Sequence, residues 1–495
     1  MDFREYFKNK KITVMGLGLL GRGVGDIAFL AQYAKELIVT DLKPSTALRP
    51  SLAKLRKFKN ITYHLGGHRL KDFNNVDLII KAAGVPVDSP YIIEARKNNI
   101  PVEMSTSLFA KLSPATLIGI TGTRGKSTVT HLIYEILKSH LGLNHSFRRT
   151  VGRNTLRSKV FLGGNVRGVA TLPLLKKVRK GDYAVLELDS WQLQGFGENN
   201  LPAQAGISPH IAVFTTFMED HLNYYKNNLD MYLLDKAQIF LHQKKDDYLV
   251  LGESVKTLIK KQYGNKIKGK IISPSHIPLQ WNIPLLGEHN KENISLAIAV
   301  AKVFGIQEKI IKNTVEKFKG VPGRMELIRT YKGIRIYNDT TATTPQATLA
   351  ALKALGSPST STSAASGSTV LSGSPSKDSV PNGSGQNQNI VLILGGADKG
   401  IDMGVLLKEI PRYCKALILL PGTGTDRILP QLRVTGNKLQ VNALVHSLKE
   451  AVKIALTYAQ KSDIILLSPA FASFGLFRNE YDRGDKFVNL VKGLK

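Results

Sequence analysis

The sequence predicts an α/β protein of three domains, and three observations carry this prediction. First, 495 residues are too many for one hydrophobic core, because domains commonly hold about 100–200 residues. Second, short apolar runs of strand length alternate with helical segments along the chain, which is typical of parallel sheets. Third, two glycine-rich turns each follow such a run and precede a helical segment.

The first domain is expected over residues 1–112. It begins with a strand, a glycine turn, a helix and a strand within 11–41, which form a βαβ unit, and further strands follow at VDLIIKAAG and NIPVEM. The second domain, 113–320, begins with the strand and glycine turn of 117–128. Its later strands are expected at YAVLEL, IAVFTT, DYLVL and KIISP.

The third domain is expected over residues 321–495, because the Pro and Gly of FKGVPGR separate a helix from a new series of strands. These strands are GIRIYND, NIVLILGG, ALILLPG and DIILLSP. Residues 357–388 do not fit a core, because they are rich in serine and poor in apolar side chains. Such a composition cannot offset the entropy cost of ordering, and a disordered surface loop is expected there.

Composition excludes several classes of protein. Hydrophobic residues make up 43% and charged residues 21%, as in ordinary globular chains. No apolar run reaches the roughly 20 residues of a membrane-spanning helix, and the start MDFREYFKNKK has no apolar leader. We therefore expect a cytoplasmic protein without membrane insertion. The single cysteine, Cys414, predicts neither an internal disulfide nor a structural zinc site, and it is expected to be a small buried hydrophobe.

The net charge of +30 suits two kinds of partner, nucleic acid or small polyanionic substrates. Residues 136–181 contribute eleven Lys or Arg and no Asp or Glu, and they include a basic stretch over 144–161. This region is either a contact for a polyanion or a solvated basic excursion. Aromatic residues are not interleaved with its charges as they are in a single-strand nucleic-acid groove. Composition alone leaves both interpretations open.

The first glycine turn is Gly16-Leu-Gly18-Leu-Leu-Gly21, and Asp41 ends the next strand 20 residues after Gly21. Glycines have no Cβ atom, so the backbone can approach a diphosphate, and the helix N-terminus adds positive partial charge. A carboxylate at the end of the second strand can accept hydrogen bonds from a ribose or a base. The turn therefore predicts a nucleotide diphosphate ligand, with NAD, FAD and other nucleotides as alternatives.

The second glycine turn, residues 119–128, departs from the strict phosphate-binding pattern, because Ile120 occupies the position of the first glycine. It keeps the central part, Gly125-Lys126-Ser127. In such a turn the backbone amides surround phosphates, the lysine contacts the outer phosphates and the serine hydroxyl binds Mg²⁺. Two nucleotide turns in separate domains indicate an enzyme that uses ATP on a nucleotide-linked substrate.

Further motifs follow one another along the chain. They are GITGTRGKST, LELDSWQL (186–193), MEDHLNYYKNNLDMYLLDKAQIF (218–240), GEHNKEN (287–293), GRMELI (323–328), NDTTATTPQATLAAL (338–352), GGADKGID (395–402) and LSPAFASFGLF (467–477). Together they resemble the motifs of the Mur ligase family over nearly the whole chain, outside the basic stretch and the serine-rich segment. The resemblance implies Rossmann-like first and third domains, for the UDP substrate and the amino acid, and a central ATP-binding domain of the phosphate-loop type.

The resemblance also implies an ATP-dependent amide ligase of peptidoglycan biosynthesis. Such an enzyme phosphorylates the terminal carboxylate of UDP-N-acetylmuramoyl-L-alanine, and the amine of glutamate then displaces phosphate. A carboxylate is a poor electrophile until its oxygen becomes a good leaving group, which explains the need for ATP. D-Glutamate is favoured, because it is the usual substrate of the family members that this chain resembles. L-Glutamate is the alternative, because the Thr-Thr-Pro ending at 343–345 resembles relatives that add L-glutamate. ATP and two Mg²⁺ ions are the implied cofactors.

Site residues are implied by the same resemblance. The catalytic residues are Lys126, Asn165, His221 and Lys236, the last of them carbamylated. One Mg²⁺ is expected on Ser127 and Glu187, and the other on His221 and Lys236. The UDP substrate is expected on Gly16, Gly18, Leu19, Gly21 and Asp41. ATP is expected on Gly122, Thr123, Gly125, Lys126, Ser127, Thr128, Asn290, Asn293, Arg324 and Asp339. Glutamate is expected on Thr343, Lys399 and Ser473.

Asn290 and Asn293 are three residues apart and can share one face of a helix start, which suits the adenine contact that the resemblance implies. Capping of the helix is the alternative role. The chain departs from the family pattern at three positions. Thr341 replaces a lysine, Gly323 replaces a histidine and Glu480 replaces an aromatic residue of the glutamate pocket.

Two other functions are weighed against the ligase. One is a non-catalytic protein that binds nucleotides or nucleic acid. The retained residues argue against it, namely Lys126, Glu187, His221 and Lys236. The other is a nicotinamide oxidoreductase, which leaves the second glycine turn unexplained. We expect a monomer whose partners are the UDP substrate, glutamate and ATP, and nucleic acid is not an expected partner.

Overall fold

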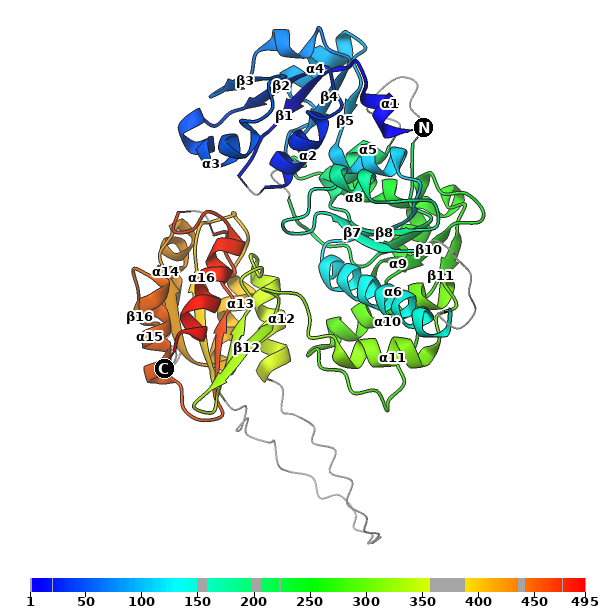
Figure 1. Ribbon diagram of the computed structural model, residues 1–495. Helices are drawn as coiled ribbons and strands as arrows, with labels where there is room; N and C mark the ends of the chain where they lie inside the picture. The colour runs from blue at the N-terminus through cyan, green and yellow to red at the C-terminus, as the bar shows by residue number, and fades with distance from the viewer. Residues whose placement is uncertain are drawn as a thin grey trace. The chain divides into compact units, whose positions relative to one another are not determined.

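The computed structural model describes residues 2–19, 21–148, 158–197, 206–221, 224–356, 388–434, 441–473 and 475–494. These residues form three β-sheets flanked by helices (Figure 1). They divide into two compact units, Met1–Pro284 with His289–Phe318 and Leu285–Glu288 with Lys319–Lys495. The first unit holds two sheets and the second unit holds one. The predicted α/β fold class is confirmed.

The first sheet is parallel and has the strand order β3-β2-β1-β4-β5. Its strands are β1 (Lys11–Met15), β2 (Glu36–Asp41), β3 (Ile61–Leu65), β4 (Leu78–Lys81) and β5 (Val102–Glu103). Its helices are α1 (Phe3–Phe7), α2 (Arg22–Leu30), α3 (Ser45–Leu55), η1 (Leu70–Phe73), α4 (Pro90–Lys97) and α5 (Ser105–Leu112). The strand order reverses at β1, and ligands of open parallel sheets bind at such a point.

The second sheet is also parallel, with the order β11-β10-β9-β6-β8-β7. Its strands are β6 (Thr116–Thr121), β7 (Val160–Gly164), β8 (Tyr183–Glu187), β9 (Ile211–Phe214), β10 (Tyr248–Leu251) and β11 (Lys270–Ile272). The α-helices of this part are α6 (Lys126–Arg148), α7 (Ser190–Leu193), α8 (Leu229–Leu241), α9 (Glu253–Tyr263), α10 (Glu288–Val303) and α11 (Glu308–Lys317). Its short 3-10 helices are η2 (Leu172–Lys176), η3 (Gln194–Phe196) and η5 (Gly264–Lys266).

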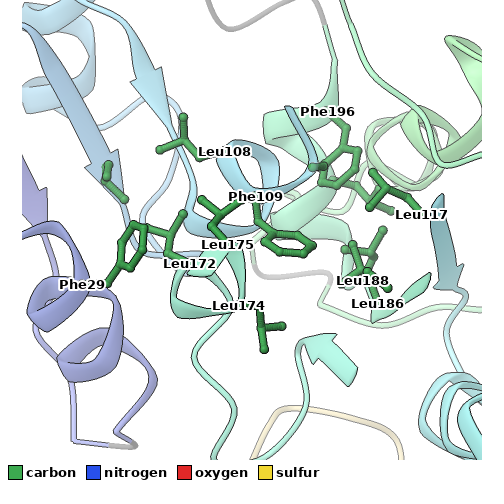
Figure 2. Close-up of a cluster of buried hydrophobic side chains, with 14 of the residues drawn as sticks. Phe29, Leu108, Phe109, Leu117, Leu172, Leu174, Leu175, Leu186, Leu188 and Phe196 are labelled. Carbon is green, nitrogen blue, oxygen red and sulfur yellow. The ribbon is translucent and has the colours of Figure 1, made fainter. Parts of the chain in front are cut away.

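A continuous hydrophobic core joins the two sheets of the first unit (Figure 2). Phe29 of α2 and Phe109 of α5 belong to the same buried cluster as Leu172 of η2 and Leu186 of β8. Burial of such side chains stabilises the fold by about 25 cal/mol for each Å² of apolar surface. The first glycine turn therefore leads into a helix, α2, that packs against residues of the second sheet and of η2.

The third sheet has the order β12-β13-β17-β14-β15-β16. Its strands are β12 (Glu326–Tyr331), β13 (Ile334–Asn338), β14 (Ile390–Gly395), β15 (Cys414–Leu420), β16 (Val441–Leu444) and β17 (Ile464–Leu467). Its helices are α12 (Pro345–Gly356), α13 (Gly404–Tyr413), α14 (Thr423–Val434), α15 (Leu448–Tyr458) and α16 (Glu480–Lys492). The edge strand β12 runs antiparallel to β13, and the other neighbouring strands are parallel.

Several further predictions from the sequence can be compared with these helices and strands. Cys414 is free and buried in β15, as expected. None of the helices in the described ranges is both long and apolar enough to cross a bilayer. The loop predicted over 357–388 lies outside the described residues except for its last residue, and part of the basic stretch over 144–161 does so as well. The bounds of the three predicted domains, 1–112, 113–320 and 321–495, stay predictions.

Candidate active site

The first glycine turn is shaped by Asp41 at the end of β2. Oδ2 of Asp41 accepts hydrogen bonds from the backbone amides of Leu17 (3.0 Å) and Gly18 (3.1 Å), and Oδ1 accepts one from the amide of Lys43 (2.9 Å). Gly18 and Gly21 have φ values of +68° and +84°, where glycine has no steric penalty. The residues predicted for the UDP substrate therefore lie together beside the ends of β1 and β2: Gly16, Gly18, Leu19, Gly21 and Asp41.

The second glycine turn connects β6 to α6 and has no space for a side chain at two positions. A Cβ atom added to Gly122 would collide with Oγ1 of Thr215, and one added to Gly125 would collide with Oδ1 of Asn293. The backbone amide of Thr123 donates a hydrogen bond of 2.7 Å to a carbonyl oxygen just after β9. The turn is therefore supported from β9 on one side and from α10 on the other, and Ser127 and Thr128 follow it in the first turn of α6.

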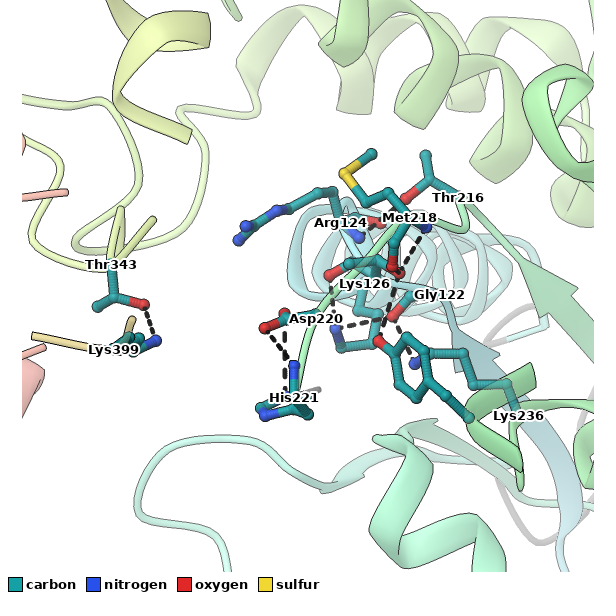
Figure 3. Close-up of polar contacts among 12 residues, drawn as sticks. Gly122, Arg124, Lys126, Thr216, Met218, Asp220, His221, Lys236, Thr343 and Lys399 are labelled. Atoms are coloured by element: carbon teal, nitrogen blue, oxygen red, sulfur yellow. Dashed lines mark hydrogen bonds and ion pairs between the residues drawn. The ribbon is translucent and has the colours of Figure 1, made fainter. Parts of the chain in front are cut away.

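Two lysine side chains meet at one carbonyl oxygen of this turn (Figure 3). The Nζ atoms of Lys126 and Lys236 each donate a hydrogen bond of 2.9 Å to the oxygen of Gly122. Lys236 belongs to α8 and is buried. Its burial, and next the charge of Lys126, hold the pKa of Lys236 well below its usual value. A lysine in this environment is available as a neutral amine, which is a nucleophile.

The residues predicted to bind metal come from separate elements. Glu187 ends β8, beside β6, and is only 4% exposed. His221 has a left-handed backbone, with φ of +54°, and its ring packs against Trp191 with 4.7 Å between the centroids. Among the described residues, no three His, Cys, Asp or Glu side chains converge as a metal cluster. A metal ion here would need ligands of other kinds, such as the hydroxyl of Ser127 or a modified Lys236.

Asn165 directly follows β7 and is held by both its backbone and its side chain. Its backbone amide donates a hydrogen bond of 2.7 Å to the carbonyl oxygen of Glu187. Its side-chain oxygen accepts a hydrogen bond of 2.6 Å from Nη1 of Arg22 in α2. The residue predicted near the acceptor end of the substrate thus lies between the end of β8 and the first glycine turn.

Asn290 and Asn293 lie at the start of α10, close to the second glycine turn. Nδ2 of Asn293 donates a hydrogen bond of 3.1 Å to Oδ1 of Asn290, and both side chains are buried. The close approach of Asn293 to Gly125 places the pair beside the turn. Because α10 begins at Glu288, neither asparagine occupies the capping position, and the capping alternative is wrong.

The second unit carries the other two predicted ATP residues. The carboxylate of Asp339, just after β13, accepts hydrogen bonds from the backbone amide of Met325 (3.1 Å) and the hydroxyl of Ser468 (2.8 Å). Arg324 is the chain neighbour of Met325. Arg324 and Asp339 are therefore brought together at the carboxyl end of β13.

Two of the three predicted glutamate residues, Thr343 and Lys399, meet within the second unit. Nζ of Lys399 donates a hydrogen bond of 2.9 Å to Oγ1 of Thr343 (Figure 3). Ser473 follows Ala472, which pairs with Ala397 in an isolated antiparallel bridge two residues before Lys399. The structure thus brings together one cation and one hydroxyl group of the predicted set, and Ser473 lies on the neighbouring segment.

Three charged residues of this region were not predicted. Arg22 contacts Asn165 as described. Asp235, beside Lys236 in α8, is half-buried, and loss of solvent raises its pKa to about 6. Arg483 of α16 is fully buried and donates a hydrogen bond of 2.8 Å to the carbonyl oxygen of Thr340. Charges on helices are usually solvated, and the partners here come from distant segments, so the sequence carried no signal for them.

Two parts of the chain match known protein domains. Residues 120–273 match the Mur ligase middle domain, and residues 10–103 match the Mur ligase MurD-like, N-terminal domain. A UDP-N-acetylmuramoylalanine--D-glutamate ligase from Roseiflexus sp. (strain RS-1) is 32% identical over 98% of this chain and 98% of its own length. The chain belongs to the Mur ligase family.

This Mur ligase is also similar to a protein of the same name from Borreliella burgdorferi (strain ATCC 35210), at 30% identity over 99% of each chain. Among solved structures, the MurF ligase from Thermotoga maritima in complex with ADP matches with a TM-score of 0.54 and 13% identity. That match covers 99% of this chain and 96% of the other, and it shows a shared fold. The family expected from the sequence motifs is therefore confirmed.

Proposed function

We propose that this Mur ligase joins D-glutamate to UDP-N-acetylmuramoyl-L-alanine with ATP as the energy source, in peptidoglycan biosynthesis. The observation that carries the proposal is the whole-length similarity to ligases named for this reaction, at 32% and 30% identity. The first unit supports it, because one turn suits a nucleotide diphosphate and the other suits the phosphates of ATP.

The proposed reaction has two steps. A carboxylate oxygen of the alanine end attacks the γ-phosphorus of ATP, the bond from that phosphorus to ADP breaks, and an acyl phosphate forms. The amine of glutamate then attacks the acyl carbon, the carbon–oxygen bond to phosphate breaks, and the nitrogen loses a proton. We assign Lys126 to the γ-phosphate, because its ammonium group lies at the second glycine turn and both steps concentrate negative charge.

Lys236 is assigned a carbamylated state. Its lowered pKa favours the neutral amine, whose nitrogen can attack CO₂, form an N–C bond and release a proton. The carbamate carries a negative charge close to Lys126, which shares the Gly122 oxygen with Lys236, and this cation stabilises it. The modification converts a buried amine into an oxygen ligand.

Mg²⁺ is the proposed cofactor, on Ser127 and Glu187 at one site and on His221 and carbamylated Lys236 at the other. Glu187 fits this role, because it is only 4% exposed at the end of β8 and its carboxylate makes no hydrogen bond to a described side chain. Its oxygens can therefore bind a cation, and oxygen ligands suit Mg²⁺. The metal supplies positive charge for phosphoryl transfer.

Glutamate is assigned to Lys399, Thr343 and Ser473. The ammonium group of Lys399 suits a carboxylate, and the hydroxyl groups add short polar contacts. Adenine is assigned to Asn290 and Asn293, and the phosphates and ribose of ATP to Arg324 and Asp339. D-Glutamate is preferred because both named relatives use it, and L-glutamate is the alternative.

The test is a reaction with ATP, Mg²⁺ and UDP-N-acetylmuramoyl-L-alanine, divided between D-glutamate and L-glutamate. We expect phosphate release, and a product heavier by one glutamate residue, with D-glutamate only. Lys126→Ala should abolish release, whereas Lys138→Ala should not, because Lys138 of the same helix is exposed and pairs with Glu135. Release with L-glutamate alone would select the alternative, and silence with both would contradict the proposed function.

The enzyme is further proposed to act in the cytoplasm as a monomer without nucleic acid. Its proposed nucleotide substrates are polyanions, and a net charge of +30 attracts them electrostatically. A mass measurement in solution tests the monomer. A DNA titration at several salt concentrations tests the second point, because nucleic-acid binding falls steeply with salt.

A further inference from the structure

We propose that Arg22 binds the diphosphate of the nucleotide-linked substrate together with Asn165, and that Arg22 sets the orientation of the Asn165 amide. The inference rests on the proposed function, because it concerns the same substrate. It adds a binding residue that the glycine motif does not include. Its basis is the hydrogen bond of 2.6 Å from Nη1 of Arg22 to Oδ1 of Asn165.

Arg22 stands where an anion is expected. It is the first residue of α2, and the N-cap of this nine-residue helix is Gly21 of the first glycine turn. The first backbone amides of a helix lack intrahelical acceptors, and the helix N-terminus carries positive partial charge. The guanidinium group adds a full positive charge at the same position.

Both partners of the bond are held by rigid parts of the fold. The backbone amide of Asn165 is bonded to the Glu187 carbonyl oxygen, and Gly164 approaches that carbonyl so closely that a Cβ atom would collide with it. On the other side, Oδ1 of the buried Asp26 in α2 accepts a hydrogen bond of 3.0 Å from the amide of Leu172. The packing of the two sheets therefore fixes how Arg22 faces Asn165.

The bond decides which way the Asn165 amide points. Arginine has donors only, so the atom that faces Arg22 must be the carbonyl oxygen of the amide. The NH₂ group of Asn165 is consequently turned away from Arg22 and is available as a donor. The guanidinium group keeps further N–H donors beyond the one that it uses here. The pair therefore offers several donors and one positive charge, which is the chemistry of an anion site.

The charge of Arg22 has no full counter-charge in the described part of the chain, where no carboxylate lies within ion-pair distance of it. Asp26 of the same helix interacts with Arg22 electrostatically, but its carboxylate forms no ion pair with Arg22 and accepts the amide of Leu172 instead. A diphosphate has adjacent anionic oxygens, and guanidinium groups bind such oxygens through paired, charge-assisted hydrogen bonds. This ligand chemistry matches both the free donors and the missing negative charge.

The test measures UDP binding to the whole protein by calorimetry without ATP, so that catalysis is not required. Arg22→Leu should weaken UDP binding about tenfold or more, the cost of one charge-assisted hydrogen bond. Arg22→Lys keeps the charge without the planar fork and should give an intermediate loss. Asn165→Asp keeps an oxygen acceptor for Arg22 but replaces the NH₂ group, and it should also weaken UDP binding.

Two controls separate binding from folding. Arg4→Leu removes an equal charge from an exposed position of α1, where Arg4 pairs with Asp2, and should leave UDP binding unchanged. The affinity of each variant for ATP should stay within about twofold of the parent, since one lost local bond leaves the second turn intact. Parental UDP affinity in Arg22→Leu would overturn this assignment alone. A parent protein that binds no UDP would overturn the proposed function as well.

Discussion

At Gly125, the absence of a methyl group allows the second glycine turn to lie against Asn293 of α10. The residue also has φ of +84°, which side chains rarely adopt. Lys236 shows the same dependence on local surroundings, because its chemistry follows from burial and from Lys126 rather than from its identity. The sequence motifs predict both residues for the site, but they cannot supply the distances that give these residues their properties.

Gly125→Ala should abolish ATP binding, because the new Cβ would displace either the turn or Asn293. Gly142→Ala is the matched control, since Gly142 lies later in α6 with open space around its Cβ position. The control should keep full activity and gain about 0.5–1 kcal/mol of stability, as expected for alanine within a helix. ATP titrations and thermal unfolding would check both variants, and normal ATP binding in Gly125→Ala would contradict this account.

Lys236→Ala should lose nearly all phosphate release, because no carbamate can form at that position. Formate or acetate should restore part of the rate by supplying a carboxylate in the space that the lysine leaves. Lys126→Ala should not respond to these anions, since it lacks a cation rather than an oxygen ligand. Phosphate release measured against formate concentration gives the result. Equal rescue of the two variants would argue against the assigned roles.

The helix α2 is the element that connects the first glycine turn to the second sheet. It packs Phe29 into the shared core and accepts the Leu172 amide on Asp26. No periodic pattern reveals this docking, because it depends on a close approach at Gly25 and Ala170 and on a buried acid. The strands β3, β7, β12 and β16 were likewise not predicted. β3 and β12 are only partly buried, and β7 lies within the basic residues 136–181.

Asp26→Asn should stabilise the protein at pH 7.5 but not near pH 4. Burial raises the folded-state pKa of Asp26 from 3.8 to about 6, so between these values the folded chain holds a proton that the unfolded chain has lost. Stability from this group is therefore fully present below pH 4 and is lost as the pH rises through 6. The neutral asparagine avoids that loss, which is on the order of 2–3 kcal/mol. Denaturant unfolding at both pH values measures it, and an equal effect at both would refute this explanation.

Arg483 connects α16 to the segment that follows β13, as Asp26 connects α2 to the segment around Leu172. Its guanidinium group binds the carbonyl oxygen of Thr340, next to Asp339 and the predicted glutamate residue Thr343. Arg483→Met should raise the KM for glutamate while UDP affinity stays unchanged, because the loop loses an anchor that lies entirely in the second unit. Arg478→Met, an exposed position near the start of α16, is the control and should leave the KM unaltered. Unchanged KM in both variants would rule out an anchoring role.

The whole molecule consists of two compact units, and the predicted site residues are divided between them. The first unit holds both glycine turns, Glu187, Lys236 and the asparagine pair of α10. The second holds Arg324, Asp339 and the residues predicted to bind the substrate glutamate, which are Thr343, Lys399 and Ser473. Binding of the nucleotide substrate and acceptance of the amino acid are thus assigned to separate bodies.

A chain cut after Phe318 should bind UDP with the affinity of the full protein and release no phosphate. The reason is that the first glycine turn lies within the first unit, whereas the residues proposed to bind glutamate lie in the second. Calorimetry with UDP and a phosphate assay measure the two properties, and circular dichroism checks that the fragment is folded. Phosphate release with glutamate from this fragment would contradict the division.

The α/β class, the position of both glycine turns and the family follow from the sequence, because strand-length apolar runs, glycine spacing and ordered motifs are local properties of the chain. The tertiary structure alone decided that Lys126 and Lys236 share one oxygen, that Arg22 faces Asn165, and that Arg483 is buried. Each of these depends on segments far apart in sequence that packing brings within hydrogen-bond distance. Burial also lowers the pKa of Lys236 and of Arg483, and no local pattern encodes burial of a single charged side chain.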